Sequence, residues 1–190
     1  MHPDSVLTLF RRCGALLEGH FRLTSGLHSR GYLQCALVLQ HPDHAAALGV
    51  ALAERVRDLH VTTVVSPALG GIVIGHEVAR ALGARAVFAE RQDGRLALRR
   101  GFTMTAGERV LVVEDVVTTG GSTRETIEVS RTAGAQVVGV AAIIDRGGAT
   151  SRFDVPFSAL TETALPTYAP EDCPLCVEGT PVVKPGSIIA

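Results

Sequence analysis

Hydrophobic residues follow two different periods along the middle of this 190-residue chain, and the two periods alternate. Four short segments are rich in apolar residues, and the run at 110–113 is unbroken, which is the pattern of strands buried on both faces of a parallel sheet. They cover residues 61–65, 84–89, 110–113 and 137–144. Three segments with apolar residues three or four positions apart predict helices. They cover residues 43–59, residues 72–82 and a stretch that begins near residue 123. Strands that alternate with helices predict an α/β domain whose parallel sheet is flanked by helices.

Smaller elements are expected outside this core. They are, in chain order, a helix at 6–17, an edge strand near Phe21 and Leu23, a turn at Ser25-Gly26, a strand-like run at 32–39, a hairpin turn at Asp93-Gly94 and a final edge element at 153–160. From Pro166 onward the chain is rich in proline and glycine, so we expect an irregular tail. The expected single domain therefore has a small N-terminal hood (1–40), a core (41–165) and a tail (166–190).

Composition and charge narrow the possible partners. Apolar residues make up 46% of the chain and charged residues 19%, which is a globular composition. The formal net charge of −1 gives no basic face for nucleic acid or a membrane surface, so neither partner is expected. No apolar run is long enough to span a membrane, and the N-terminus lacks a signal-peptide pattern. We therefore expect a cytoplasmic protein.

Cysteine and lysine usage adds two constraints. We expect Cys13 and Cys35 to be small core residues. Cys173 and Cys176 form a lone CPLC motif, and a structural zinc site would need two more ligands, which no second cysteine pair supplies. An ordinary turn in the tail is favoured there over metal binding or redox chemistry. Lys184 is the only lysine, so cationic chemistry before the tail has to use arginine or histidine.

The stretch from Val110 to Ser130 carries the clearest chemistry. Its apolar strand ends in Glu114 and Asp115, and the loop TTGGS (118–122) leads into a predicted helix. Glycines allow close approach of the main chain, and a helix N-terminus favours a phosphate through its free N–H groups and dipole. Two acids beside such a loop would face hydroxyl groups or a metal ion. A ribose 5-phosphate has this layout, although a plain strand, turn and capped helix is the simpler alternative.

The unbroken match from Val112 to Ser122 closely resembles the phosphoribosyl-diphosphate signature of type I phosphoribosyltransferases. It is not a Walker loop or a dinucleotide fingerprint, because GK[ST] and GxGxxG are absent. The resemblance implies that the acids contact the ribose hydroxyls and that the loop holds the 5-phosphate. The loop SPALGG (66–71) resembles the pyrophosphate-binding loop of that family. The phosphoribosyl-diphosphate site predicted in this way comprises Ala68, Gly70, Glu114, Asp115, Val116, Val117, Thr118, Thr119, Gly120, Gly121 and Ser122.

Two further motifs resemble the members of that family that use orotate. They are FRLTSGLHS (21–29) and DRGG (145–148). The resemblance implies an orotate site formed by Ser25, Tyr32, Thr118 and Arg146, with Arg146 at a carbonyl edge of the base. The implied reaction transfers ribose 5-phosphate to N1 of orotate and releases pyrophosphate, as in pyrimidine biosynthesis. Mg²⁺ is the implied cofactor, held mainly by substrate, with a water-mediated contact to Asp115 as its expected link to protein. Arg146 paired with Asp145, and Tyr32 as a half-buried strand residue, are the simpler alternatives.

The chain departs from better-known members in one segment. Those members carry a long, mobile, lysine-rich loop with a histidine, whereas this chain has RQDGRLALRRGF (91–102). Thr24 and Gly70 also stand where relatives have lysine. Arg91, Arg99 and Arg100 are the available cations, and we expect them to stabilise the leaving group, since arginine binds phosphate bidentately. A solvated basic hairpin is the alternative. In relatives this loop reaches a neighbouring subunit, which implies a homodimer.

Three other functions are alternatives to this expectation. They are a type I transferase for another nucleobase, a non-catalytic regulator of the same fold, and a simple phosphosugar-binding module. FRLTSGLHS and DRGG favour orotate over a purine or uracil. The net charge of −1 and the chain length leave no basic face or added domain for a nucleic-acid-binding regulator.

Overall fold

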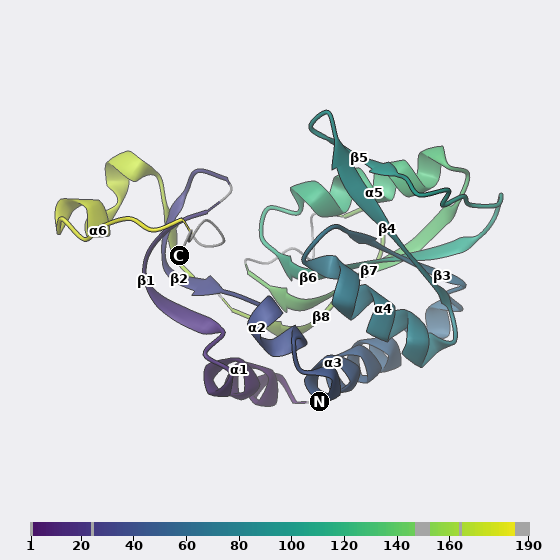
Figure 1. Cartoon of the computed structure of the whole chain (residues 1–190), viewed down its shortest axis with the longest axis horizontal. Helices are drawn as coiled ribbons and strands as arrows, with labels where there is room; N and C mark the ends of the chain where they lie inside the picture. The colour runs from purple at the N-terminus through teal and green to yellow at the C-terminus, as the bar shows by residue number, and fades with distance from the viewer. Residues whose placement is uncertain (1, 24, 147–152, 164, 185–190) are drawn as a thin grey trace.

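The computed structural model describes residues 2–23, 25–146, 153–163 and 165–184, and within these it contains two β-sheets (Figure 1). The larger sheet has six strands in the order β5-β4-β3-β6-β7-β8. They are β3 (Thr63–Pro67), β4 (Arg85–Gln92), β5 (Arg95–Leu98), β6 (Arg109–Val117), β7 (Gln136–Asp145) and β8 (Phe157–Glu162). All neighbouring pairs are parallel except β4 and β5, which form an antiparallel hairpin. The predicted parallel sheet and the turn at Asp93-Gly94 are thereby confirmed.

Helices cover both faces of this sheet, and the strand sequences explain why. Leu111 and Val113 belong to one apolar cluster, which includes residues of α3 (Pro42–Arg55) and α4 (Gly71–Leu82). Val110 and Val112 belong to a second cluster, which contains Ile127 of α5 (Gly121–Thr132). Successive strand side chains point to opposite faces, so a strand covered on both sides needs an unbroken apolar run. That requirement explains the valine-rich pattern of the sequence.

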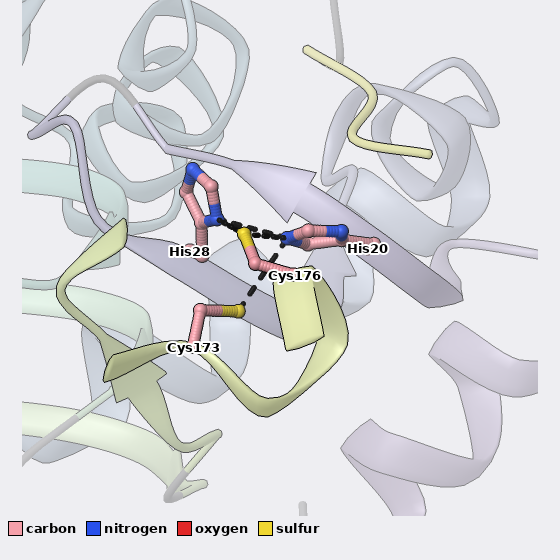
Figure 2. Close-up of side chains that lie close together, drawn as sticks. All are labelled: His20, His28, Cys173 and Cys176. Carbon is pink, nitrogen blue, oxygen red and sulfur yellow. Dashed lines mark hydrogen bonds between the residues drawn. The ribbon is translucent and has the colours of Figure 1, made fainter. Parts of the chain in front are cut away.

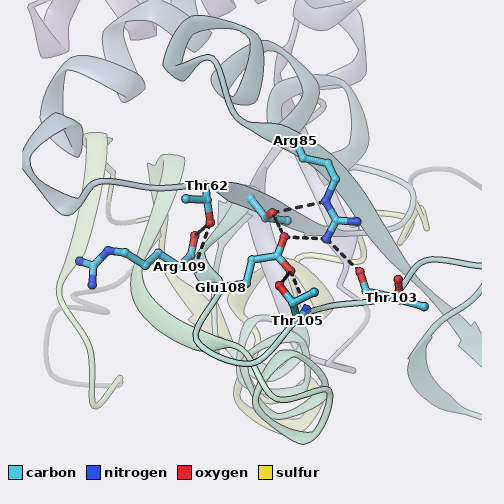
Figure 3. A network of polar contacts seen from close by, with 7 residues as sticks. Thr62, Arg85, Thr103, Thr105, Glu108 and Arg109 are labelled. Atoms are coloured by element: carbon cyan, nitrogen blue, oxygen red, sulfur yellow. Dashed lines mark hydrogen bonds and ion pairs between the residues drawn. The ribbon is translucent and has the colours of Figure 1, made fainter.

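A polar network around Glu108 joins the amino ends of three strands of the larger sheet (Figure 3). Its carboxylate lies 2.7 Å from Nη2 of Arg85 and also accepts hydrogen bonds from the Thr63 hydroxyl and, at 2.9 Å, from the Thr105 amide. These residues lie at or just before the amino ends of β3, β4 and β6. The network therefore aligns the strands at the edge that lies away from the carboxyl ends.

A second, smaller sheet forms the hood beside the core (Figure 1). It has the order β1-β2-β9, with β1 at Leu16–Arg22, β2 at His28–Leu33 and β9 at Thr167–Tyr168. Both pairings are antiparallel, and His28 pairs with Tyr168. The hood is therefore built from both ends of the chain.

Three predictions about the ends of the chain were wrong in detail. The first helix, α1 (Pro3–Arg12), ends before residue 17, because Gly14 adopts a left-handed conformation (φ 62°) and residues 16 and 17 start β1. The strand-like run at 32–39 divides into the end of β2 and a short helix, α2 (Ala36–Leu39). The tail contains ordered elements beside β9, namely η3 (Pro170–Asp172) and α6 (Pro174–Val177).

The helix expected at 43–59 is α3 followed by a separate turn, η1 (Arg57–Leu59), after a break at Val56. The helices expected at 72–82 and from residue 123 are confirmed as α4 and α5. In the described part of the chain, no helix is both long enough and apolar enough to cross a bilayer.

Candidate functional site

A pocket of about 440 Å³ lies where the carboxyl ends of β6 and β7 meet the hood. Parallel strands place their carboxyl ends at one edge of the sheet, which is where ligands bind in open α/β folds. The pocket walls include the paired acids, the loop 118–122, Arg91, and the hood residues Ser25 and Tyr32. A second cavity, of about 330 Å³, shares Ser25 and Arg146 with the first. The segments predicted from separate motifs therefore converge on one site.

Glu114 and Asp115 lie in the last part of β6, which continues to Val117 rather than ending before the acids. Burial, followed by the charge of Asp115, raises the pKa of Glu114 well above its usual value. Burial also raises the pKa of Asp115, although its carboxylate accepts a hydrogen bond from the Val116 amide at 2.8 Å. Hydroxyl donors or a cation would stabilise the charged form of both carboxyl groups, which burial disfavours. Carboxylate oxygens are also ligands that suit Mg²⁺, so these residues fit that ion.

The loop after β6 has the geometry of an anion-binding turn. Gly120 has φ 73° and precedes the first residue of α5, where no side chain caps the helix. The first amides of this 12-residue helix are therefore available to a ligand, and the helix dipole favours a negative charge there. Nη2 of Arg124 donates a hydrogen bond to the Thr119 carbonyl at 2.9 Å, so a cation also lies close to the loop. This arrangement suits a phosphate.

The loop SPALGG approaches the acids through its glycines. A Cβ atom built on Gly70 would lie 2.7 Å from Oδ2 of Asp115, and one on Gly71 would lie 3.0 Å from Oε2 of Glu114. Gly70 has helical backbone angles (φ −58°), so close approach, and not an unusual conformation, is what requires glycine here. Ala68 and Gly70 do not line the main pocket as described, but Gly70 contacts one of its acids.

Arg146, which directly follows β7, links the core to the hood. Its Nη2 donates a hydrogen bond to the Ser29 hydroxyl at 3.2 Å, and its Nε is buried with no partner among the described residues. Burial lowers the pKa of Arg146, whereas burial and then the charge of Asp115 raise the pKa of the half-buried Tyr32 phenol. A buried donor without a partner costs free energy, which a ligand acceptor such as a base carbonyl would recover.

The three candidate arginines occupy different environments. Arg91 lines the pocket, and its Nη1 lies 3.1 Å from Oε2 of Glu125. Arg100 donates two hydrogen bonds to Glu90, at 2.7 and 2.8 Å, and its guanidinium lies over the Phe88 ring. Arg99 is exposed. In this conformation the pocket wall therefore includes Arg91 but neither Arg99 nor Arg100.

Sequence reasoning gave no role to several residues of the site, among them Ser29 and Glu125. Ser29 lies in the FRLTSGLHS motif without a predicted role, yet its hydroxyl accepts a hydrogen bond from Arg146. Glu125 lines the pocket, and its spacing on α5 is a signal only once Arg91 is known to lie opposite. Thr24 and the two glycines of DRGG, 147 and 148, lie outside the described residues.

Comparison with known proteins gives consistent matches. The model of the phosphoribosyl transferase domain family matches residues 36–164. The orotate phosphoribosyltransferase of Pelotomaculum thermopropionicum is 52% identical over 187 residues, covering 98% of each chain. The crystal structure of the Aeropyrum pernix orotate phosphoribosyltransferase superposes with a TM-score of 0.67 at 26% identity, covering 83% of this chain and 93% of that one. The Mycobacterium tuberculosis orotate phosphoribosyltransferase in complex with 5-phospho-alpha-D-ribosyl 1-diphosphate superposes with a TM-score of 0.65 at 26% identity, covering 84% and 95%.

Proposed function

The chain belongs to the phosphoribosyl transferase domain family, and from that premise we propose that it transfers ribose 5-phosphate from phosphoribosyl diphosphate to orotate. The products are orotidine 5-phosphate and pyrophosphate, a step in the biosynthesis of pyrimidine nucleotides. One observation carries the proposal: a phosphate-type loop, two partly buried acids and an arginine with an unpartnered buried Nε all line one pocket. Relatives that are about 50% identical over nearly their whole length are named for this activity, orotate phosphoribosyltransferase.

The donor would lie along the carboxyl end of β6. Its 5-phosphate would bind the amides of residues 118–122 at the start of α5, and its ribose hydroxyls would donate hydrogen bonds to Glu114 and Asp115. The pyrophosphate would extend toward the loop that contains Ala68 and Gly70. Hydroxyl donors stabilise the charged form of both carboxylates, so donor binding would lower the raised pKa values of this pair.

Orotate would bind between the hood and the end of β7. The unpartnered Nε of Arg146 would donate to a carbonyl of the base, while Ser25, Tyr32 and Thr118 line the same cavity. Ser29 would keep the guanidinium in place through its hydroxyl. An arginine also offsets the negative charge of the orotate carboxylate, which uracil lacks. This contrast would favour orotate over uracil.

The reaction breaks the bond between C1 of the ribose and the pyrophosphate oxygen, and the bonding electrons leave with pyrophosphate. N1 of orotate supplies the electron pair of the new bond to C1 and loses its proton, which the departing pyrophosphate or water takes up. The residues of the pocket would accelerate this exchange by aligning the two reactants and by stabilising the charge that develops on the leaving group. Arg91 would serve that second task, because it lines the pocket together with its partner Glu125, whereas Arg100 lies outside the pocket wall and is paired with Glu90. We therefore rank Arg91 above Arg99 and Arg100.

Magnesium, dimerisation and location complete the proposal. Mg²⁺, when bound, would neutralise part of the pyrophosphate charge, and Asp115 would contact it through water. A homodimer would let the 91–102 segment approach the pocket of a second subunit. A cytoplasmic location is also a proposal, which fractionation of cells that express the protein would test.

The test is an absorbance assay that follows consumption of orotate with phosphoribosyl diphosphate and Mg²⁺, repeated with uracil and adenine as acceptors. We expect turnover with orotate only, and Arg146→Ala should raise the KM for orotate more than that for the donor. Arg57→Ala is a matched control, because Arg57 is exposed before β3 and outside the pocket. Turnover with adenine or uracil alone would support a transferase for another base, and no turnover with any acceptor would support a non-catalytic protein.

A further inference from the structure

Two histidines of the hood and two cysteines of the tail meet in one cluster (Figure 2). His20 lies on β1 and His28 on β2, while Cys173 caps α6 and Cys176 lies within that helix. Nε2 of His20 lies 2.8 Å from Nδ1 of His28 and 3.5 Å from Sγ of Cys173. Sγ of Cys176 lies 3.3 Å from Nδ1 of His28 and 3.8 Å from Nε2 of His20. The lone CPLC motif thus has two imidazole neighbours that are about 150 positions away in sequence.

Main-chain hydrogen bonds bring these four residues together. The amide of Val183 donates to the carbonyl of His20, and the carbonyl of Val183 accepts from the amide of Arg22, both at 2.8 Å. His28 pairs with Tyr168 of β9, a few residues before the first cysteine. His20, His28 and Cys173 are buried, and Cys176 is exposed. The cluster is therefore a fixed feature of the junction between hood and tail.

The distances between the four side-chain atoms fit a tetrahedral metal site. Tetrahedral zinc, with bonds of about 2.0–2.1 Å to nitrogen and about 2.3 Å to sulfur, separates its ligand atoms by roughly 3.3–3.8 Å. Three of the four nitrogen–sulfur and nitrogen–nitrogen distances given above lie in that range, and all four ligand atoms lie within 4.8 Å of one another. The nitrogens of His20 and His28, at 2.8 Å, would have to separate by about 0.5 Å. Side-chain rotation is sufficient for a shift of that size.

The second nitrogen of His20 supports the same interpretation. Its Nδ1 lies 2.7 Å from the Thr180 carbonyl oxygen, which can only accept a hydrogen bond. Nδ1 therefore donates to that carbonyl, which leaves Nε2, the ring nitrogen that faces the cluster, as the atom available to a metal ion. A ring nitrogen held by a backbone carbonyl is the usual outer support of a histidine metal ligand.

We propose that His20, His28, Cys173 and Cys176 bind one Zn²⁺ ion that joins the tail to the hood. Two sulfur and two nitrogen ligands in a tetrahedral arrangement favour zinc over magnesium or calcium, which prefer oxygen. Four protein ligands leave no open position for a substrate, so the ion is structural. This proposal does not depend on the proposed function, because it concerns metal content and stability.

The proposed metal site is connected to the pocket through Ser29, the residue that follows His28. His28 is followed by Ser29, whose hydroxyl accepts a hydrogen bond from Arg146 and donates one to the Pro166 carbonyl at 3.1 Å. Thr167 of β9 lines the second cavity together with Arg146. Loss of the metal would therefore loosen the strands that hold Arg146 and would be expected to weaken orotate binding more than donor binding.

The experiment measures metal in the full chain, produced without a histidine tag. We expect about one zinc per chain by elemental analysis, as for other closed four-ligand sites. Cys173→Ser and Cys176→Ser should each lower the zinc content at least severalfold. Cys13→Ser is the matched control, because Cys13 belongs to a separate group of possible ligands with His41 and His44. Zinc absent from the wild-type chain after exposure to the ion, or lost only in Cys13→Ser, would overturn the proposal.

A second measurement covers the case in which the cysteine variants fail to fold. Cobalt(II) substituted into the wild-type chain should give intense visible bands of a tetrahedral site and a near-ultraviolet charge-transfer band from thiolate ligands. Chelation should lower the Tm, and added zinc should restore it. A cobalt spectrum without thiolate charge transfer, or a mass spectrum that shows a disulfide between Cys173 and Cys176, would refute the site.

Discussion

Gly70→Ala tests whether the glycine loop is required by its distance to Asp115. The backbone of Gly70 is already helical, so alanine introduces no torsional strain. Its Cβ would lie 2.7 Å from Oδ2 and 3.0 Å from Cγ of Asp115, whereas ordinary contacts begin near 3.4 Å. The loop or the carboxylate must therefore move by about 0.7 Å. The acid proposed to hold the ribose would lose its position while the fold stays intact.

The size of the effect follows from that displacement. A misplacement of about 1 Å at a reacting centre can cost about 100-fold in rate, so a shift of about 0.7 Å corresponds to roughly 10- to 30-fold. We expect kcat/KM for phosphoribosyl diphosphate to fall by that factor, with circular dichroism unchanged. Stability carries an opposing term, since replacing glycine by alanine at compatible angles stabilises a protein by about 0.4–1 kcal/mol through the unfolded state.

A double-mutant cycle separates the two terms. Asp115→Ala removes the atoms that the new methyl group would meet, so in that background Gly70→Ala should raise the free energy of unfolding by about 0.4–1 kcal/mol. In the wild-type background the same substitution should raise the free energy of unfolding by less, or lower it, because the new methyl group is too close to the Asp115 carboxylate. Denaturant titration of the four proteins measures the cycle. Equal stability changes in both backgrounds, or full activity in Gly70→Ala, would refute the reasoning.

Three other predictions concern charge and burial. Arg91→Ala should lower kcat/KM for the donor about 10- to 100-fold, because Arg91 lines the pocket. Arg95 is exposed on the same hairpin, so Arg95→Ala should leave kcat/KM unchanged. Equal losses in the two variants would exclude a specific role for Arg91. Burial raises the pKa of Asp115 in the folded state, so the folded chain binds its proton more tightly and stability falls as pH rises above the ordinary carboxyl range near about 4. Asp115→Asn should therefore raise the Tm of the ligand-free chain at pH 7 and lose that advantage as pH falls to about 4, and parallel Tm profiles would contradict this. Ser66→Ala should be neutral or stabilising by up to about 1 kcal/mol in denaturant titration, because the Ser66 hydroxyl is buried with no partner in the described chain; a clear loss would reveal a hidden partner.

The core was predictable because its signals are local. A strand covered on both faces needs an unbroken apolar run, so Val110–Val113 identified β6 from the sequence. Asp93 and Gly94 adopt positive φ angles of 51° and 81°, as a tight hairpin turn requires. Glu114 and Asp115 followed the buried run directly, so their place at the ligand edge could be predicted once a parallel sheet was expected.

The hood was less predictable because its elements depend on distant partners. Helical spacing continued through Leu16 and Leu17, although the chain turns at Gly14 and those residues pair with β2. Likewise, an apolar run does not distinguish a strand from a buried helix, which is why α2 was missed.

Contacts between residues far apart in sequence were also out of reach. The CPLC motif supplies two of the four possible ligands, and nothing local in the sequence indicates that His20 and His28 would face it. The fit of Gly70 against Asp115 is likewise a tertiary distance that only the fold reveals.

The shared construction of the hood affects the order of assembly during synthesis. The hairpin of β1 and β2 is made early, but a two-stranded hairpin alone is marginally stable in water. Its third strand, β9, and the segment bonded to Arg22 follow the last strand of the central sheet in the chain, so they are synthesised after that sheet. The nascent chain can therefore complete its central sheet before the sheet of the hood, and a truncated product that stops near residue 165 would keep the loop 118–122 yet lack the third strand of the hood.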